Sequence, residues 1–420
     1  MDVQTSTTQQ LDRYPAYRES GVDWLGEVPA HWEVKRLKHV CKINAKTLPE
    51  NTPKELNIDY VDISSVSFEK GIEQSEPFTF EKAPSRARRL ASIGDTIVAT
   101  VRTYLKAIDI VSEKWANHVF STGFAVLSPK RNIVPTYLAA YTKSNAFTDQ
   151  VSTNSVGISY PAINSTDLGN LLVPMPPESE QTAIARYLDE RTAQIDRAVA
   201  RKERLIELLR ERQQILVQRA VTKGLDPNAP MRDSGVDWLG EVPVGWEVKS
   251  LKHIARLQSG ETISSSDFTK EGYPVYGGNG FRGFTNSYTN EGDFALIGRQ
   301  GALCGNVNYA SGKFFASEHA IVVYTWRNQN ILWLGEAIKA ADFNRLSQSA
   351  AQPGIAVGII KDVQFAEPPP SEQIAIAKFI ETTNQKTTQA ITLQRTQIER
   401  LREYKATLVD AVVTGRVKVA

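Results

Sequence analysis

Two stretches of the chain carry apolar residues at helical spacing over an unusual length. Residues 180–222 contain neither proline nor glycine. Their apolar side chains fall on two heptad positions, with Leu188, Ile195, Leu209 and Leu216 on one and Ala185, Val199, Ile206 and Ala220 on the other. Such a stripe predicts one continuous helix with a coiled-coil-like seam. At about 1.5 Å per residue the helix would be roughly 65 Å long.

Residues 372–414 repeat this pattern at a constant offset of 192 without a gap, and 15 of the 43 paired positions are identical. Either helix alone would expose its apolar stripe to water. The two helices are therefore predicted to pack against each other. Since each follows a large globular segment, an antiparallel pair with pseudo-two-fold symmetry is expected.

A second duplication marks the start of each globular segment. Residues 20–40 (SGVDWLGEVPAHWEVKRLKHV) and 234–254 (SGVDWLGEVPVGWEVKSLKHI) differ at only four of 21 positions. Each copy contains two tryptophans around a Gly-Glu-Val-Pro turn. We interpret Trp24, Trp32, Trp238 and Trp246 as buried anchors of a compact docking segment rather than as a ligand site.

Short β-rich runs separated by turns fill the two globular segments. They fall at residues 60–64, 96–100, 108–111 and 124–127, and again at 276–283, 294–298 and 321–324, with helix expected near 135–147. The segments align loosely, since 95–100 matches 293–298, 120–127 matches 315–322, and Gly157-Ile158 matches Gly354-Ile355. The proline-rich stretches 172–177 and 367–370 are interpreted as linkers, and Ser179 as the N-cap of the first long helix.

These patterns predict an α+β chain with a pseudo-two-fold internal repeat. Two β-rich α/β domains are joined by two long antiparallel coiled-coil-like helices. The predicted boundaries are 1–177 for the first domain, 178–223 for the first long helix, 224–367 for the second domain and 368–420 for the second long helix.

Composition and motifs exclude several classes of function. The 420 residues carry a net charge of +2 and only two cysteines, and the first 17 contain no apolar core of a signal peptide. No run approaches the roughly 18 apolar residues of a membrane span. The five histidines form no metal-binding pattern, and no phosphate-binding loop, nucleophile elbow or amino-methyltransferase signature occurs. We therefore expect a cytoplasmic protein without catalytic residues, metal site or cofactor of its own.

Basic and amide side chains on turns offer a different chemistry. Arg, Lys, Asn and Gln are the residue types that contact base edges and phosphates in duplex DNA. A solvated basic surface is the alternative interpretation of each position, although Arg102 and Arg299 follow matched strands at nearly equivalent places. The predicted DNA-binding residues are Arg86, Arg88, Arg89, Arg102, Tyr104 and Lys106 in the first domain, and Tyr276, Asn279, Arg282, Arg299, Gln300 and Lys313 in the second. Arg299 is expected to contact a base, and Arg89 and Lys313 to contact phosphates.

With both duplications in view, the chain resembles the DNA-specificity subunit of type I restriction–modification systems. The match rests on SGVDWLGEVPxxWEVK at both domain starts, KGLDPNAPMRDSGVDWLG at the junction, PVYGGNG and IGRQGALCGNV in the second domain, and PP(P/E)SEQ(T/I)AIA at both helix starts. The resemblance implies that each globular segment is a target-recognition domain for one half of a split, asymmetric DNA site. It also implies that the helices are spacers.

The same resemblance implies partners. The subunit would be non-catalytic and would position two methyltransferase subunits that use S-adenosylmethionine to methylate adenine, joined by two restriction–translocase subunits that use ATP and Mg. The rival interpretation is a non-catalytic scaffold in which two β-rich modules bind a protein or a carbohydrate. Steep salt dependence of binding to duplex DNA would distinguish the two.

Overall fold

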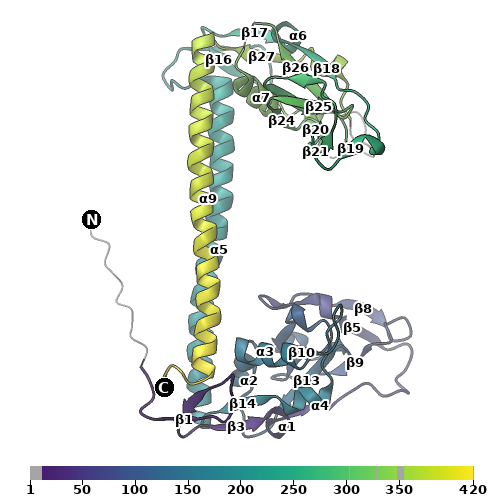
Figure 1. Cartoon of the computed structure of the whole chain (residues 1–420), viewed down its shortest axis with the longest axis vertical. Coiled ribbons are helices and arrows are strands. Elements are labelled where there is room, and N and C mark those ends of the chain that lie inside the picture. Colours follow the sequence, from purple (N-terminus) through teal and green to yellow (C-terminus); the bar gives the residue numbers. More distant parts are fainter. Residues whose placement is uncertain (1–11, 302, 328, 348–353, 420) are drawn as a thin grey trace. The chain divides into compact units, whose positions relative to one another are not determined.

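A computed structural model describes residues 12–301, 303–327, 329–347 and 354–419 (Figure 1). Residues 1–11, on which part of the signal-peptide prediction rests, lie outside the described residues. The chain divides into two compact units: residues 1–201 with 396–420 form the first, and residues 202–395 form the second. None of the helices in the described ranges combines the length and the apolar content that a membrane crossing requires.

The first unit is built mainly from short strands. Its helices besides the long ones are α1 (Leu37–Val40), α2 (Pro135–Thr142), α3 (Asn145–Thr153) and α4 (Ser165–Asn170). Its strands are β1 (Tyr17–Glu19), β2 (Glu27–Pro29), β3 (Glu33–Arg36), β4 (Cys41–Ile43), β5 (Asn57–Val61), β6 (Val66–Ser67), β7 (Gly71–Ile72), β8 (Glu76–Thr79), β9 (Ala87–Leu90), β10 (Thr96–Ala99), β11 (Ile108–Ile110), β12 (Val119–Ser121), β13 (Phe124–Pro129) and β14 (Leu172–Met175).

Two four-stranded sheets enclose the core of this unit. One has the order β11-β10-β13-β4 and the other β8-β5-β12-β9, with β5 and β12 parallel. Alternating apolar residues place Ile97 and Val126 from the first sheet against Val61 and Phe120 from the second, all fully buried. The runs predicted at 96–100, 108–111 and 124–127 are therefore strands, and the region near 135–147 is helical.

The second unit uses the same kinds of element. Its shorter helices are α6 (Leu251–Ile254), α7 (Ile331–Ala340) and α8 (Val357–Ile360). Its strands are β15 (Met231–Asp233), β16 (Glu241–Pro243), β17 (Glu247–Ser250), β18 (Ala255–Ser259), β19 (Phe268–Thr269), β20 (Tyr273–Gly277), β21 (Gly280–Thr285), β22 (Asn290–Glu291), β23 (Phe294–Gly298), β24 (Val307–Ala310), β25 (Lys313–Ala316), β26 (Ala320–Thr325) and β27 (Gln364–Glu367).

The two larger sheets of the second unit repeat the strand order of those in the first. The order β18-β26-β23-β24 corresponds to β4-β13-β10-β11, and β21-β20-β25-β22 corresponds to β8-β5-β12-β9, with β19 added at one edge. The one parallel pair recurs as β20 with β25. The duplication therefore extends through the whole domain, although the sequence shows it clearly only in the entry segments and the long helices.

Both long helices are confirmed, as α5 (Glu178–Lys223) and α9 (Pro370–Val413). Within each unit their segments run antiparallel (Figure 1). In the first unit, Lys405 Nζ donates to Asp196 at 2.7 Å. In the second, Gln213 donates to Asn384 Oδ1 at 2.6 Å and Lys202 to Gln394 Oε1 at 3.2 Å. Lys202 and Gln213, which occupy two heptad positions of the apolar stripe, thus form hydrogen bonds across the helix seam. Such pairs fix register in paired helices.

Each entry segment fastens a long helix through one of its tryptophans. Trp32 Nε1 donates to Glu180 at 2.9 Å, and Trp246 Nε1 donates to Glu372 at 2.8 Å. Both indoles are almost completely buried, which confirms their role as anchors. The same prediction is wrong for Trp24, whose side chain is 38% exposed.

The first stretch interpreted as a linker is instead largely a strand, whereas of the second (367–370) only Glu367 lies in a strand and Pro370 begins α9. Residues 172–175 form β14, which pairs with β3, and β27 pairs with β17 in the same way. Pro174 fits there because β14 belongs to a two-stranded ribbon, whose edges tolerate a residue without an N–H. Ser179 is not an N-cap, since α5 already begins at Glu178 and Gln181 N donates to Pro177 O at 2.9 Å.

Candidate nucleic-acid interface

A loop after β10 presents the basic side chains of the first unit. Arg102 and Lys106 both adopt left-handed backbone, at φ 53° and φ 47°. This conformation is unfavourable for residues with a Cβ, and it concentrates at functional sites where the surrounding structure enforces it. Tyr104, between them, is 57% exposed. The loop therefore holds two cations and an aromatic ring at the surface at some conformational cost.

The corresponding loop of the second unit places glycines at these two positions. Ala99 N donates to Ala107 O at 2.9 Å, and Gly298 N donates to Asn306 O at 2.8 Å, so the loops align at an offset of 199. At that offset Arg102 corresponds to Gly301 (φ 90°) and Lys106 to Gly305 (φ 84°). Both units use left-handed backbone at these two positions, but only the first places charged side chains there.

This register corrects the predicted equivalence of Arg102 and Arg299. Thr100 N donates to Gly123 O at 2.8 Å and its carbonyl accepts from Ile163 N at 2.9 Å; Arg299 makes the same pair of contacts with His319 O and Ile355 N. Arg299 therefore corresponds to Thr100. The match of Gly157-Ile158 with Gly354-Ile355 is wrong for the same reason, because Ile355 corresponds to Ile163. The segment between the matched strand and the long helix has a different length in the two units. An alignment that holds at the strands therefore fails at these residues.

A turn at residues 156–162 lies against the basic loop of the first unit. Val156 and Ala162 exchange backbone hydrogen bonds at 2.8 and 3.0 Å, and Val101 forms a β-bridge with Ala162. The Arg102 guanidinium lies 5.2 Å from the centroid of the Tyr160 ring. The turn and the loop therefore form one surface that carries both cationic and apolar groups.

The other predicted basic residues of this unit lie along β9, in the second sheet. Arg88 places its guanidinium 4.5 Å from the centroid of the Phe80 ring, and Arg86 is exposed just before the strand. Burial lowers the pKa of Arg89, whose Nε is buried without a hydrogen-bond partner among the described residues. Because successive residues of a strand point to opposite faces, Arg88 and Arg89 do not present one common surface.

In the second unit, three turns bring polar side chains together. A Cβ at Gly278 would lie 3.1 Å from His319 O and 3.2 Å from Gln300 O, so the β20–β21 turn approaches both backbones closely. Asn279 is exposed at the tip of this turn, next to Gly280. Gln300 Oε1 lies 2.9 Å from His319 Nδ1. Asn279 and Gln300 therefore belong to one polar surface, whereas Arg299 beside them is half-buried.

The remaining predicted residues of the second unit are dispersed. Tyr276 packs against Phe314 in the core, with ring centroids 5.7 Å apart. Arg282 is exposed, with its guanidinium 5.8 Å from the Phe268 ring. The carboxylate of Glu291, and secondarily Tyr288, raises the pKa of Lys313, whose Nζ lies 3.9 Å from that carboxylate. The charge of Lys313 thus already has a partner, which makes it a weaker candidate for a phosphate contact.

Several side chains at these surfaces escaped the sequence prediction. In the second unit they are Glu318 and His319, which lie 3.0 Å apart, and Asn308, whose buried Nδ2 has no hydrogen-bond partner in the described part of the chain. In the first they are Val156, Ile158 and Tyr160, which are exposed to 80%, 102% and 65%. Apolar residues at every second position of a turn-rich stretch are a local signal that the sequence does contain.

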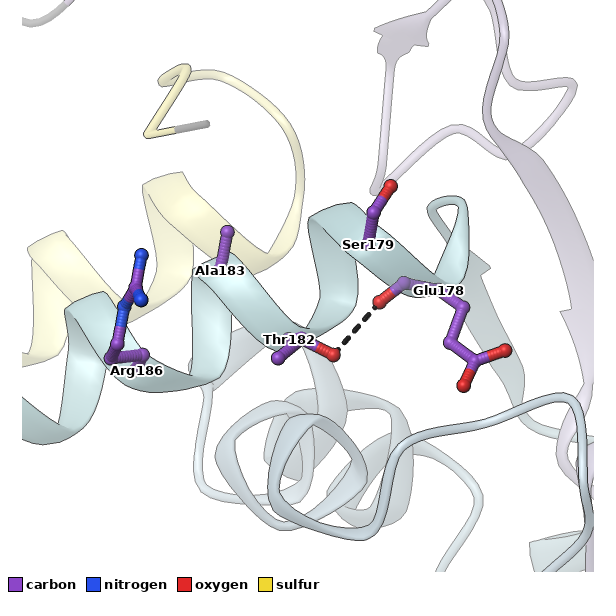
Figure 2. A pocket seen from close by; sticks show the side chains of 5 residues that line it. All are labelled: Glu178, Ser179, Thr182, Ala183 and Arg186. Carbon is purple, nitrogen blue, oxygen red and sulfur yellow. Dashed lines mark hydrogen bonds between the residues drawn. The ribbon is translucent and has the colours of Figure 1, made fainter.

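A shallow depression over the first turns of α5 is not part of either surface. Figure 2 shows Glu178, Ser179, Thr182, Ala183 and Arg186 around it, with Thr182 Oγ1 donating to the Glu178 carbonyl at 3.0 Å. These side chains all come from consecutive turns of one helix. They hold no acid–base pair or nucleophile in hydrogen-bond contact, so this depression offers no candidate chemistry.

Comparisons with known proteins identify the chain. The family model described as "Type I restriction modification DNA specificity domain" matches residues 29–207 and again 243–400. A putative type I restriction enzyme MjaX specificity subunit from Methanocaldococcus jannaschii is 23% identical over 94% of this chain and 96% of its own. The EcoprrI specificity subunit from Escherichia coli is 38% identical over a shorter part, 32% of this chain and 34% of that protein.

Solved structures share the fold. A chain from a structure titled as complex assembly and conformational transition of the type I R-M system matches with a TM-score of 0.72, at 23% identity, over 92% of this chain and 98% of its own. The HsdS subunit from Thermoanaerobacter tengcongensis matches with a TM-score of 0.55, at 23% identity, over 93% and 98%. The protein- or carbohydrate-binding scaffold is not favoured by these matches. The chain belongs to the family of type I restriction–modification DNA specificity domains, and it contains that domain twice.

Proposed function

We propose that the chain binds a bipartite, asymmetric site in duplex DNA, with one half of the site recognised by each unit. One observation carries the asymmetry. The two units share their sheet order, yet equivalent loop positions hold Arg102 and Lys106 in the first and Gly301 and Gly305 in the second. Identical frames with different side chains at matching places should recognise different sequences.

Salt dependence of binding tests this proposal directly. Each phosphate neutralised by a basic side chain lowers log K by roughly 0.9 per tenfold rise in salt concentration. A plot of log K against log salt concentration should have a slope of several units in magnitude. This should hold for the full chain both alone and assembled with methyltransferase subunits. Replacing either half of the site should weaken binding, with the other half still recognised. Salt-independent binding, or equal affinity for any duplex, would contradict the proposal.

We propose that this chain positions catalytic subunits and carries no catalytic centre itself. Its partners would be two methyltransferase subunits, joined by two restriction–translocase subunits, and S-adenosylmethionine, ATP and Mg would bind to these partners. In the described part of the chain no three His, Cys, Asp or Glu side chains gather as a metal site would require. Measuring the mass of the purified assembly checks the stoichiometry. Methyl transfer by the isolated chain would refute the non-catalytic role.

We propose that α5 and α9 set the separation of the two half-sites. Inserting seven residues after Arg201 and seven after Arg395 keeps the heptad seam and lengthens both helices by roughly 10.5 Å. At about 3.4 Å per base pair, the preferred gap between half-sites should grow by about three base pairs. Binding to duplexes with graded gap lengths measures this shift. An unchanged optimal gap length would contradict the proposal. Insertion into α5 alone is the control, because it breaks the register in which Gln213 bonds to Asn384.

A further inference from the structure

The turn at residues 156–162 of the first unit exposes more apolar surface than a folded loop requires. The side chain of Ile158 is completely exposed, and Val156 and Tyr160 are largely so. Tyr104 and Leu105, from the loop after β10, are exposed to 57% and 41%. Single exposed apolar residues are ordinary, but a group on one surface marks an interaction site.

The turn is held firmly against the basic loop. Thr103 N donates to Pro161 O at 3.3 Å, and the hydroxyls of Thr103 and Ser155 lie 3.0 Å apart. Together with the bridge between Val101 and Ala162, these contacts fix the apolar tip of the turn (Val156, Ile158 and Tyr160) relative to Arg102. The tip therefore projects from a supported base.

Arg102 adjoins the apolar tip, Lys106 lies in the same loop, and their positive charges indicate which kind of partner the tip suits. The Arg102 guanidinium lies over the Tyr160 ring, and Lys106 Nζ lies 5.7 Å from the centroid of the Phe68 ring. Both cations occupy left-handed backbone that glycine occupies in the other unit. An apolar tip beside fixed cations fits a polyanion with a stacked apolar interior, and duplex DNA has both properties.

We propose that Ile158, supported by Val156 and Tyr160, acts as a wedge that inserts at a base step of the half-site bound by the first unit. This inference rests on the proposed DNA-binding function and adds a mode of recognition to it. Arg102 beside the tip contacts the same half-site, and the wedge partly unstacks one step. Steps differ in the free energy needed to unstack them, so the wedge contributes specificity without hydrogen bonds to bases.

The second unit lacks these side chains in its sequence. At the offset of 192 that pairs Ile163 with Ile355, residues 155–162 (SVGISYPA) correspond to 347–354 (SQSAAQPG). Gln348, Ala350 and Gln352 thus stand where the first unit has Val156, Ile158 and Tyr160; these three lie outside the described residues. The wedge should therefore act on one half-site only.

The experiment compares Ile158→Ala with Ile158→Leu in the full chain assembled with its methyltransferase subunits. Loss of the apolar contact should weaken binding roughly 10- to 50-fold, whereas Leu should retain most of the affinity. The slope of log K against log salt should not change, because no phosphate contact is removed. Ile93→Ala is the matched control, since Ile93 is 66% exposed in the same unit but outside this surface.

A 2-aminopurine base placed at successive positions of the site reports unstacking. The wild-type complex should brighten the probe at one step of one half-site, and Ile158→Ala should abolish that signal. Unchanged affinity and unchanged probe fluorescence in Ile158→Ala would overturn the wedge. So would weaker assembly with methyltransferase subunits at an unchanged probe signal, which would make the turn a protein-docking surface. If the wild type showed no site-specific binding at all, the proposed function itself would fail.

Discussion

Replacing Arg102 by glycine should leave the first unit as stable as before, or slightly more stable, while weakening DNA binding. Left-handed backbone costs a residue with a Cβ roughly 1–2 kcal/mol. Glycine removes that cost but gains about 0.5–1 kcal/mol of freedom in the unfolded chain. The net change in unfolding free energy should thus be between about 0 and 1.5 kcal/mol in favour of the variant. Equivalent Gly301 in the second unit shows that the loop accepts this residue.

The loss of binding should reach roughly 1–3 kcal/mol if Arg102 contacts a base, with relaxed preference at one position. If Arg102 contacts a phosphate, all sequences should weaken together and the salt slope should fall by about one. Arg102→Asn separates charge from conformation, because Asn tolerates left-handed backbone better than most residues. Hydrogen exchange of the loop and salt-resolved binding measure both effects. A variant that binds DNA normally would show that Arg102 does not contact DNA, and a variant that loosens the unit would show that Arg102 has a structural role.

Gly298→Ala should disrupt the polar surface of the second unit. A Cβ at this position would lie 2.2 Å from Gly278 O and 3.1 Å from Leu303 O, and neither is a flexible side chain. The β20–β21 turn must therefore move away from the loop that holds Gln300. Overpacking of this kind costs typically about 1–3 kcal/mol. We expect faster hydrogen exchange at residues 277–280 and 298–306 and loss of recognition of one half-site.

Gly245→Ala is the control for this substitution, since nothing lies within 4 Å of the added Cβ and its backbone is not left-handed. Its exchange rates and DNA binding should match those of the wild type. If Gly298→Ala bound DNA with unchanged preference at both half-sites, the polar surface around Gln300 and His319 would not be a recognition surface.

The sequence predicts the frame of this protein well because the frame depends on repetition and local periodicity. The long helices follow from a stripe of Leu, Ile, Val and Ala residues that continues without proline or glycine over more than 40 positions. The entry segments follow from near identity. Where residue types and their spacing repeat in this way, the local sequence alone determines which secondary-structure element forms.

The recognition surfaces depend on tertiary contacts, and there the prediction was weaker. The second unit aligns with the first at an offset of 199 residues around Thr100, but at an offset of 192 around Ile163. No local feature of the sequence marks that change. Pro174 suggested a linker because the pairing of β14 with β3 involves residues far apart in the sequence. Tyr276 looked like a DNA contact, yet it packs on Phe314 from a different strand. The exposure of Ile158 likewise could only be seen once the turn had been placed against its loop.

The central claim is that each unit recognises its own half of one DNA site. A genome-wide map of methylated adenines in the source cells tests it, with the gene intact, deleted, and replaced by the Arg102→Gly variant. One bipartite motif should be methylated with the intact gene and unmethylated after deletion. In the variant, methylation should weaken or relax only in the half recognised by the first unit. An unchanged map after deletion, or relaxation of both halves together in the variant, would contradict the account.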